Sequence, residues 1–246
     1  MIVDLGIRGR RAIVNGGSAG MGKGSAFALA REGVDLVISA RGEDRLLKTC
    51  DEIQKETNVN VTPIKADHST DEGRNKILSA CPEPDILVGT CTPPPFTYSY
   101  EKVSAEEWRE TLDVSLLSPV EFMRATIPGM VERKWGRIVN ISSIGVKYGG
   151  SYNSMDYTFS KSALESITTS LAKQYTSDNI LINCIRVGVT NTKFHEKNPK
   201  DMSKRISLIP IGRMAKPDEI AKVVYFLGSD ENSYISGDTI TVAGGE

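Results

Sequence analysis

A glycine-rich loop near the start of the chain is the feature that most restricts the possible fold. Residues 16–22 read GGSAGMG, follow a short apolar run at residues 11–15 and precede a stretch of helical composition at residues 25–31. This order predicts a strand, a loop and a helix. Glycines let the backbone approach a pyrophosphate, and the N–H groups at a helix N-terminus attract its negative charge. Because the spacing is G-x-x-x-G-x-G and not G-x-G-x-x-G, a plain structural turn is the alternative.

Strand and helix patterns alternate along the rest of the chain. Ser104 and Glu107 form the sequence pattern of a capping box at the start of a long helix. This alternation predicts an α/β fold, a doubly wound parallel sheet with helices on both faces, and the length suits a single domain over residues 1–246. The expected strands lie at residues 34–39, 59–64, 85–88, 138–141, 180–186 and 238–242, and the expected helices at 44–57, 69–81, from 104 onward, 162–175 and 218–227.

Charge and composition exclude several classes of function. The chain of 246 residues has a net charge of -1, and its basic and acidic residues are interspersed, so no nucleic-acid partner is expected. Its four cysteines lack C-x-x-C spacing and it has only two histidines, so no metal site is expected. The N-terminal residues have no apolar core of signal-peptide length, and no apolar run of membrane-spanning length occurs. We therefore expect a cytoplasmic protein.

Tyr157 and Lys161 lie four positions apart at the start of a predicted helix, so they share one helix face. A phenol titrates near 10, and a cation about 5 Å away supplies on the order of 3 of the roughly 4 kcal/mol that would bring its pKa to about 7. An oxidised nicotinamide ring would add a second positive charge. With Ser143 holding the substrate oxygen, this pair suits reversible hydride transfer between a carbonyl and an alcohol. The alternative is that the pattern marks only a helix start.

Arg41 ends the second predicted strand, about 20 residues after the glycine loop. In dinucleotide folds this position carries either an acid for the ribose hydroxyls of NAD or an arginine for the 2′-phosphate of NADP. Since no acid stands at the strand end, NADP is preferred and NAD is less expected, although Arg41 could also be a surface charge. Asp67, followed by His68, is placed after the third strand to meet the adenine amino group.

Taken together, these motifs resemble the short-chain dehydrogenase/reductase family over nearly the whole chain. The resemblance implies an NAD(P)-dependent oxidoreductase with a seven-stranded Rossmann sheet, usually a homotetramer, with a homodimer as the other possibility. It also implies that Ser143 orients the carbonyl, that Tyr157 is the acid or base, that Lys161 binds the nicotinamide ribose and that Thr192 contacts the cofactor. The motifs are the glycine loop, Asp67, Asn140-Ile141-Ser142-Ser143, Tyr157-x-x-x-Lys161, Val187-Gly188 with Thr192, and Gly212-Arg213 before Pro217-Asp218-Glu219-Ile220.

The chain departs from the family pattern at several positions. Asn15 replaces a usual Thr, Val187 replaces a usual Pro, and Gly89-Thr90-Cys91-Thr92 replaces Asn-Asn-Ala-Gly. Ser115 stands where the family commonly has the Asn whose backbone carbonyl holds a relay water near the lysine. We therefore expect a rearranged relay and a less certain cofactor side of the fourth strand.

The main hypothesis is an NADP(H)-dependent oxidoreductase that interconverts a small-molecule carbonyl and a secondary alcohol. One alternative is a 3-oxoacyl-thioester reductase acting on carrier protein or coenzyme A. Another is a catalytically weakened nucleotide-binding or regulatory protein. Residues 195–211 read as a mobile lid beside the site. The expected catalytic residues are Ser115, Ser143, Tyr157 and Lys161, and the expected cofactor-binding residues are Gly16, Ser18, Gly20, Met21, Gly22, Arg41, Asp67, His68, Thr90, Tyr157, Lys161, Gly188, Thr190 and Thr192.

Overall fold

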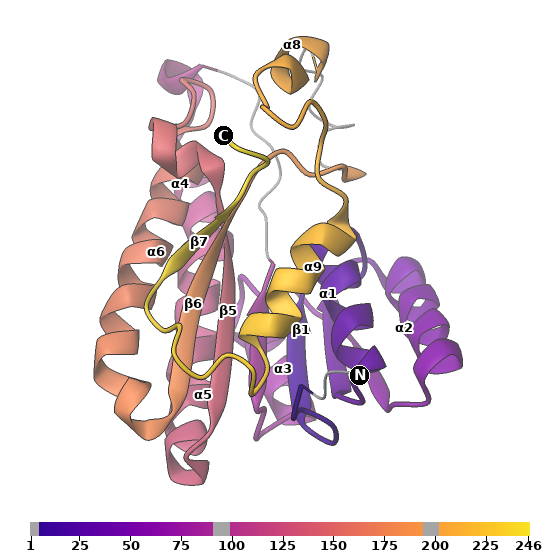
Figure 1. Ribbon diagram of the computed structural model, residues 1–246. Helices are drawn as coiled ribbons and strands as arrows, with labels where there is room; N and C mark the ends of the chain where they lie inside the picture. The colour runs from indigo at the N-terminus through magenta and orange to yellow at the C-terminus, as the bar shows by residue number, and fades with distance from the viewer. Residues whose placement is uncertain (1–4, 91–98, 194–201) are drawn as a thin grey trace.

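Seven parallel strands form one sheet in the order β3-β2-β1-β4-β5-β6-β7 (Figure 1). The computed structural model describes residues 5–90, 99–193 and 202–246. The strand order reverses between β1 and β4, and in open parallel sheets ligands bind outside the carboxyl ends of the strands at such a point. The strands are β1 Arg11–Asn15, β2 Asp35–Ala40, β3 Val61–Lys65, β4 Ile86–Gly89, β5 Gly136–Ser143, β6 Ile180–Val187 and β7 Thr239–Val242.

Helices cover both faces of the sheet, as the sequence predicts. One face carries α1, α2 and α9, of which α1 and α9 pack closely together, and the other carries α3, α5 and α6. The short α8 lies beyond the carboxyl edge of the sheet (Figure 1). The α-helices are α1 Gly20–Arg31, α2 Glu43–Thr57, α3 Asp71–Ala80, α4 Ala105–Leu112, α5 Ser118–Arg133, α6 Met155–Tyr175, α8 Met202–Ser207 and α9 Pro217–Leu227, and 3-10 turns lie at Tyr100–Lys102, Ile144–Tyr148 and Thr176–Asp178.

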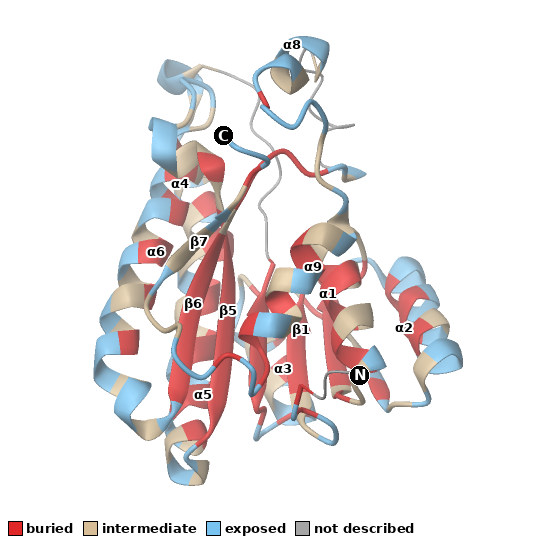
Figure 2. Ribbon diagram, viewed as in Figure 1, coloured by how far each residue is buried: buried red, intermediate tan, exposed pale blue. Residues whose placement is uncertain are grey.

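The sheet separates two apolar cores. Alternate residues of a strand face opposite sides, so Val14 packs in the core beneath α1 and α9, whereas its neighbour Ile13 packs in the core beneath α5 and α6. Both faces of the sheet are therefore shielded from solvent, and the central strands are buried along their length (Figure 2). This burial explains why the strands read as continuous apolar runs and not as alternating ones.

The long helix predicted from Ser104 forms, but it is interrupted. The capping box is confirmed: the Ser104 hydroxyl accepts the Glu107 N–H, and the Glu107 carboxylate accepts the Ser104 N–H at 2.7 Å. Between α4 and α5 the backbone widens into a π-helical turn, Asp113–Leu117, with Ser115 at its centre. Single π turns inside α-helices are frequent at functional sites, because they change which carbonyls the following N–H groups reach. The sequence pattern did not predict this turn.

Most predicted element ends are within one or two residues of the observed ends, and β5 is longer than predicted at both ends. Helix α6, which carries Tyr157 and Lys161, begins at Met155, two residues before Tyr157. Of the predicted lid, the described part is α8 and the loop after it; the stretch with His195 lies outside the described residues, as do Cys91, Thr92 and the proline-rich segment. No helix in the described part of the chain is long and apolar enough to cross a bilayer.

Candidate active site

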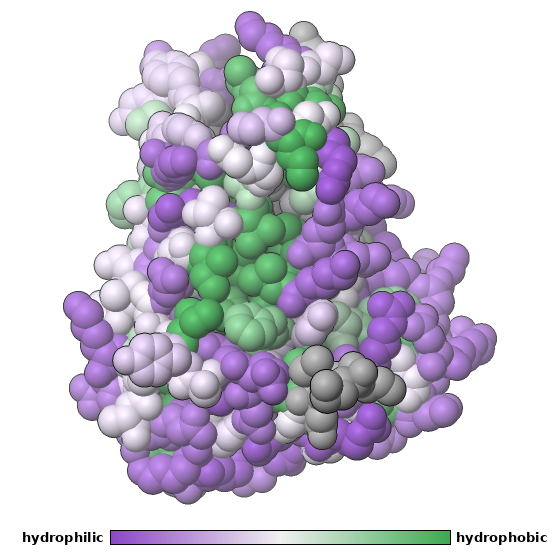
Figure 3. Space-filling view, in the orientation of Figure 1, coloured by the Kyte–Doolittle hydropathy of each residue, from purple (hydrophilic) through white to green (hydrophobic). Residues whose placement is uncertain are grey.

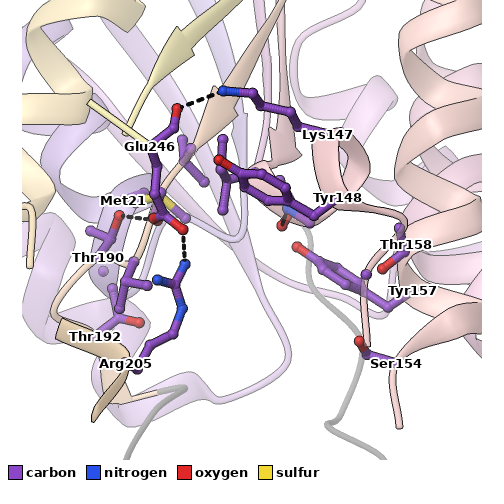
Figure 4. Close-up of a pocket in the computed structure, with 18 of the residues that line it drawn as sticks. Met21, Lys147, Tyr148, Ser154, Tyr157, Thr158, Thr190, Thr192, Arg205 and Glu246 are labelled. Atoms are coloured by element: carbon purple, nitrogen blue, oxygen red, sulfur yellow. Dashed lines mark hydrogen bonds and ion pairs between the residues drawn. The ribbon is translucent and has the colours of Figure 1, made fainter. Parts of the chain in front are cut away.

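A cavity of about 950 Å³ opens at the carboxyl edge of the sheet, where the strand order reverses. It is bounded by the glycine loop, the end of β5, the start of α6, the segment after β6, and the last residues of the chain (Figure 4). The predicted residues that line it come from all of these segments except the last: Gly16, Gly20, Met21, Gly22, Thr90, Ser143, Tyr157, Gly188, Thr190 and Thr192. The structure thus brings Ser143, Tyr157 and most of the predicted cofactor-binding loop to the wall of the same cavity.

The glycine loop leaves no room for side chains. A Cβ on Gly22 would lie 2.4 Å from the Gly16 carbonyl oxygen and 2.6 Å from the Thr90 hydroxyl. Gly16 itself has φ of +75°, which favours glycine. Backbone N–H groups at the start of α1 are therefore exposed to the cavity at close range. This bare loop at a helix N-terminus fits the pyrophosphate of a dinucleotide.

The departures at Asn15 and Thr90 are accommodated by hydrogen bonds. The Thr90 hydroxyl donates to the Asn15 backbone carbonyl at 2.6 Å, and the Ser39 hydroxyl donates to the Asn15 side-chain oxygen at 2.8 Å. All of these groups are buried. They join the ends of β1, β2 and β4, so the fourth strand keeps regular pairing with both neighbours as far as Gly89.

Ser143 and Tyr157 meet at the cavity wall, as predicted. Ser143 ends β5, and its hydroxyl accepts the Gly145 N–H at 3.2 Å and shares a hydrogen bond with the Tyr157 phenol. Lys161 follows one turn later on α6, with its ammonium nitrogen 5.8 Å from the centre of the Tyr157 ring. Its side chain is almost fully buried, at 2% exposure. The three residues are thus held together by one strand end and one helix.

The expectation of a lowered Tyr157 pKa is wrong for the protein alone. Burial raises the pKa of Tyr157 to about 12, and the hydrogen bond from Ser143 only partly opposes that increase. Desolvation raises this pKa because it disfavours the phenolate. A positive charge placed beside the phenol, such as an oxidised nicotinamide ring, would lower it.

The predicted adenosine residues lie together outside this cavity. The charge of exposed Arg41 acts on both Asp67 and His68, so the three are near one another at the ends of β2 and β3. The Asp67 carboxylate accepts hydrogen bonds from the Ser69 N–H and hydroxyl, which lower its pKa although burial opposes them. Burial lowers the pKa of His68 to about 4, so it is neutral, and its Nδ1 has no partner among the described residues. Asp67 is thus already engaged by Ser69, and His68 is buried and neutral.

Ser18, Ser115 and Lys161 are also absent from the cavity lining, as far as the described residues show. Ser18 is buried, and its carbonyl accepts the Thr49 hydroxyl at 3.2 Å. Ser115 is fully buried in the π-helical turn, with a hydroxyl that has no hydrogen-bond partner among the described residues. Lys161 is almost fully buried one helical turn after Tyr157. The structure thus does not bring these three side chains to the wall of this cavity.

Sequence reasoning missed the polar wall opposite Tyr157. Arg205 of α8 forms an ion pair with the Glu246 side chain, and the Lys147 ammonium donates to the Glu246 carbonyl at 3.0 Å. Figure 4 shows Arg205 and Glu246 across the cavity from Tyr157, whereas Lys147 and Tyr148 extend toward Glu246 from the same side as Tyr157. No local pattern links residues so distant in sequence. Their charges alone were visible, and a solvated helix face was the simpler interpretation for Arg205.

The fold and this site define a class of protein: an α/β oxidoreductase that binds a dinucleotide at the switch point of its sheet. A family model described as enoyl-(acyl carrier protein) reductase matches residues 16–246. The chain belongs to the short-chain dehydrogenase/reductase family, and it is an NAD(P)-dependent oxidoreductase, as the sequence predicts.

Relatives with different substrates are almost equally similar. The 3-oxoacyl-[acyl-carrier-protein] reductase FabG of Aquifex aeolicus is 30% identical, with 99% of each chain covered. The dehydrogenase/reductase SDR family member 4 of Homo sapiens is 31% identical, with 95% of this chain and 86% of that protein covered. The crystal structure of L-sorbose reductase from Gluconobacter frateurii, complexed with NADPH and L-sorbose, is 29% identical, has a TM-score of 0.89 and covers 99% of this chain and 98% of its own.

Proposed function

We propose that this protein uses NADP(H) to interconvert a carbonyl and a secondary alcohol, with Ser143, Tyr157 and Lys161 as the catalytic residues. The observation that carries the proposal is the Ser143–Tyr157 hydrogen bond at the wall of a cavity that also contains the bare glycine loop. Proton transfer needs a donor within hydrogen-bond reach of the substrate oxygen. Two hydroxyls that already bond to each other can hold that oxygen between them.

Each residue has a distinct part in the proposed reaction. Ser143 donates a hydrogen bond to the substrate carbonyl, and Tyr157 gives its proton to the oxygen as it becomes an alkoxide. Lys161 stabilises the phenolate that remains on Tyr157. When bound, NADPH supplies the hydride, and its oxidised form adds a positive charge beside the phenol. In the direction of oxidation Tyr157 takes the proton back.

The cofactor assignment rests on the position of Arg41. Its guanidinium is exposed at the end of β2, near Asp67 and His68, and no acidic residue stands at the strand end itself. An arginine there suits a 2′-phosphate, whereas NAD would require a carboxylate for the ribose. The complex of L-sorbose reductase with NADPH supports the same choice. Gly16, Gly20 and Gly22 would hold the pyrophosphate, and the segment from Gly188 to Thr192 the nicotinamide end.

A small hydroxylated ketone fits the polar wall better than a plain alkyl ketone. Lys147, Tyr148, Arg205 and Glu246 all line the cavity. Polar walls discriminate strongly, because a substrate without matching groups leaves buried donors and acceptors unpaired. A 3-oxoacyl thioester remains the second candidate, since a 3-oxoacyl-[acyl-carrier-protein] reductase is among the relatives. Comparing turnover of L-sorbose with that of an acetoacetyl thioester would separate the two.

The site does not support the third hypothesis, a regulatory protein without turnover. Of the positions that motivated it, Gly89 to Thr92 and Ser115, Gly89 keeps regular strand pairing and Thr90 donates a hydrogen bond to the Asn15 carbonyl, and the chain keeps Ser143, Tyr157 and Lys161. We propose instead a single catalytic domain over residues 1–246 that acts in the cytoplasm as a homotetramer or homodimer. Figure 3 shows an apolar patch over α9 and β7 that supports such an assembly. Tyr234 and Phe226 are exposed large hydrophobic residues in this part of the chain.

The decisive test replaces Tyr157 by Phe. The substitution removes the proton donor but keeps the ring, so we expect kcat for ketone reduction to fall by at least about 1,000-fold. NADPH affinity, measured by fluorescence titration, should stay within a few-fold of the original. Tyr148→Phe is the matched control, because it removes a second phenol from the same cavity and should affect KM more than kcat. Full activity in the Tyr157 variant would refute the assigned chemistry.

A further inference from the structure

The Glu165 carboxylate connects three segments that carry the active site. The Ser142 hydroxyl donates to its Oε1 at 2.5 Å. The Arg186 guanidinium donates to both oxygens, with Nε 3.1 Å from Oε1 and Nη2 2.5 Å from Oε2. Ser142 immediately precedes Ser143 on β5, and Arg186 lies two residues before Gly188 on β6. Glu165 therefore fixes the end of each strand relative to α6.

This cluster is largely removed from solvent. The Glu165 and Arg186 side chains are 11% and 22% exposed, and Ser142 is fully buried. None of the three lines the cavity, as far as the described residues show. A buried ion pair gives little net stability, because desolvation offsets most of the attraction. Its bidentate geometry does, however, restrict the relative positions of the groups it joins. The cluster can thus affect the reaction only through its neighbours.

Those neighbours include Lys161. Glu165 follows Lys161 by four residues on α6, so the two side chains share a helix face. Both charges, together with that of Arg186, act on the buried Cys184 thiol, which places all three around one point between α6 and β6. A bare carboxylate at this position would oppose the effect of the Lys161 cation on Tyr157. Arg186 supplies the balancing positive charge.

We propose that Glu165 and Arg186 are positioning residues: together they hold Ser143 and Lys161 in register, and Arg186 prevents the Glu165 carboxylate from cancelling the field of Lys161 at Tyr157. This inference rests on the roles proposed for Tyr157 and Lys161. Neither residue touches the substrate or the cofactor. Removing one member of the pair therefore changes the charge behind the site, whereas removing both restores the balance.

Other charged or titratable groups surround Tyr157 and stay unchanged in the test. The buried Asp156 carboxylate is the nearest in sequence, and it accepts the Thr111 hydroxyl of α4 at 2.7 Å. The groups on the elements packed around Tyr157 include Glu106, Glu107, Arg109 and Glu110 of α4, Asp113 of the π-helical turn, Lys147 and Tyr148 of the turn after β5, Asp156 and Lys161 of α6, Cys184 of β6, Arg205 of α8, and Glu246. Because these groups are the same in every variant, a difference in the Tyr157 pKa between variants reports the substituted pair.

The test is an ultraviolet difference titration of the Tyr157 phenol in protein saturated with NADP. Each variant carrying Tyr157→Phe as well serves as its blank. One unit charge roughly 10 Å away at an effective dielectric near 20 moves a pKa by about one unit. Glu165→Gln removes a negative charge, so the phenol should titrate about 0.5–1 pH unit lower. Arg186→Gln should shift it by a similar amount upward, and the double variant should return close to the original value.

Two further variants separate geometry from charge. Ser142→Ala removes the bond to β5 and changes no charge, so kcat should fall about 10-fold with no shift in the titration. Arg213→Gln breaks a bidentate pair with Glu219 of similar geometry on the exposed surface, with both contacts at 2.7 Å, and should change neither quantity.

If the Tyr157 phenol titrates at the same pH in the Glu165 and Arg186 variants, the proposal is overturned and the ion pair has a purely structural role. If Arg186→Gln fails to fold, Glu165→Gln and Ser142→Ala still decide, since an unshifted titration in the first or an unchanged kcat in the second contradicts the assigned roles. Failure of the proposed function is distinguishable, because it would appear as full turnover in Tyr157→Phe, whatever the titrations show.

Discussion

The dinucleotide half and the catalytic half of this cavity are built on different physical principles. In the dinucleotide half, atoms are missing where the loop packs closely on itself: a Cβ on Gly22 would lie 2.4 Å from the Gly16 carbonyl oxygen. In the catalytic half, side chains are present and their charges are adjusted, from Tyr157 at the cavity to the Glu165–Arg186 pair behind it. The first half should therefore fail when atoms are added, and the second when charges are changed.

The two halves also differ in how they depart from the family pattern. The cavity side of β1 and β4 has unusual residues, Asn15 and Thr90, whose hydrogen bonds replace the expected contacts. The catalytic side keeps Ser143, Tyr157 and Lys161. Backbone shape can be supported by several side-chain sets, whereas proton transfer needs particular functional groups at set distances. Substitutions in each half test this difference.

Among substitutions in the dinucleotide half, the largest effect is expected for Gly22→Ala. Its methyl group would overlap the Gly16 carbonyl and the Thr90 hydroxyl, so the loop must move away from the position that receives a pyrophosphate. We expect NADPH affinity to fall by at least about 100-fold and the free energy of unfolding by about 1–3 kcal/mol. Isothermal titration calorimetry and urea denaturation measure the two quantities.

Gly129→Ala is the matched control for that change. Gly129 lies inside α5, and its added Cβ would meet only the end of the flexible Arg133 side chain, at 3.1 Å. Alanine is favoured over glycine in a helix, so a slight stabilisation of about 0.5–1 kcal/mol is expected, with unchanged NADPH binding. If NADPH binding is also unchanged in Gly22→Ala, the contrast drawn between the two halves is wrong.

The elements of the fold could be predicted because their signals are local. Apolar runs buried on both faces mark β1, β2, β4, β5 and β6, and the alternation with helices requires parallel pairing. Strand order needed the resemblance to a known family. The π-helical turn at Ser115 could not be predicted, since it depends on how α4 and α5 pack against α6 and has no pattern of its own.

The site could be predicted where function depends on sequence spacing. Tyr157 and Lys161 share a helix face, and the glycine loop is contiguous. The Lys161–Glu165 spacing was also visible, but its meaning depends on Arg186, which another strand supplies. The sign of the Tyr157 pKa shift was missed because the extent of burial, which raises that pKa, cannot be read from spacing.

A smaller effect, confined to one cofactor, is expected for Arg41→Ala. The charge of its exposed guanidinium acts on both Asp67 and His68, and it would contact a 2′-phosphate by charge-assisted hydrogen bonds. Losing such bonds costs about 1.5–3 kcal/mol, or roughly 10- to 100-fold in KM for NADPH. Steady-state kinetics with NADH should show little change. Equal losses for both cofactors would contradict the NADP assignment.

The smallest effect tests whether hydrogen bonding really supports the unusual strand ends. Thr90→Val keeps the shape of the side chain but removes the donor to the Asn15 carbonyl, which is then buried with only the weak 3.3 Å bond from the Thr90 N–H. We expect a loss of about 1–2 kcal/mol in urea denaturation, with NADPH affinity reduced only a few-fold. Thr90→Ser, which keeps the hydroxyl, should recover most of the stability. A valine variant as stable as the original would show that packing against Gly16 and Gly22, and not this hydrogen bond, holds the two strands together at the cavity.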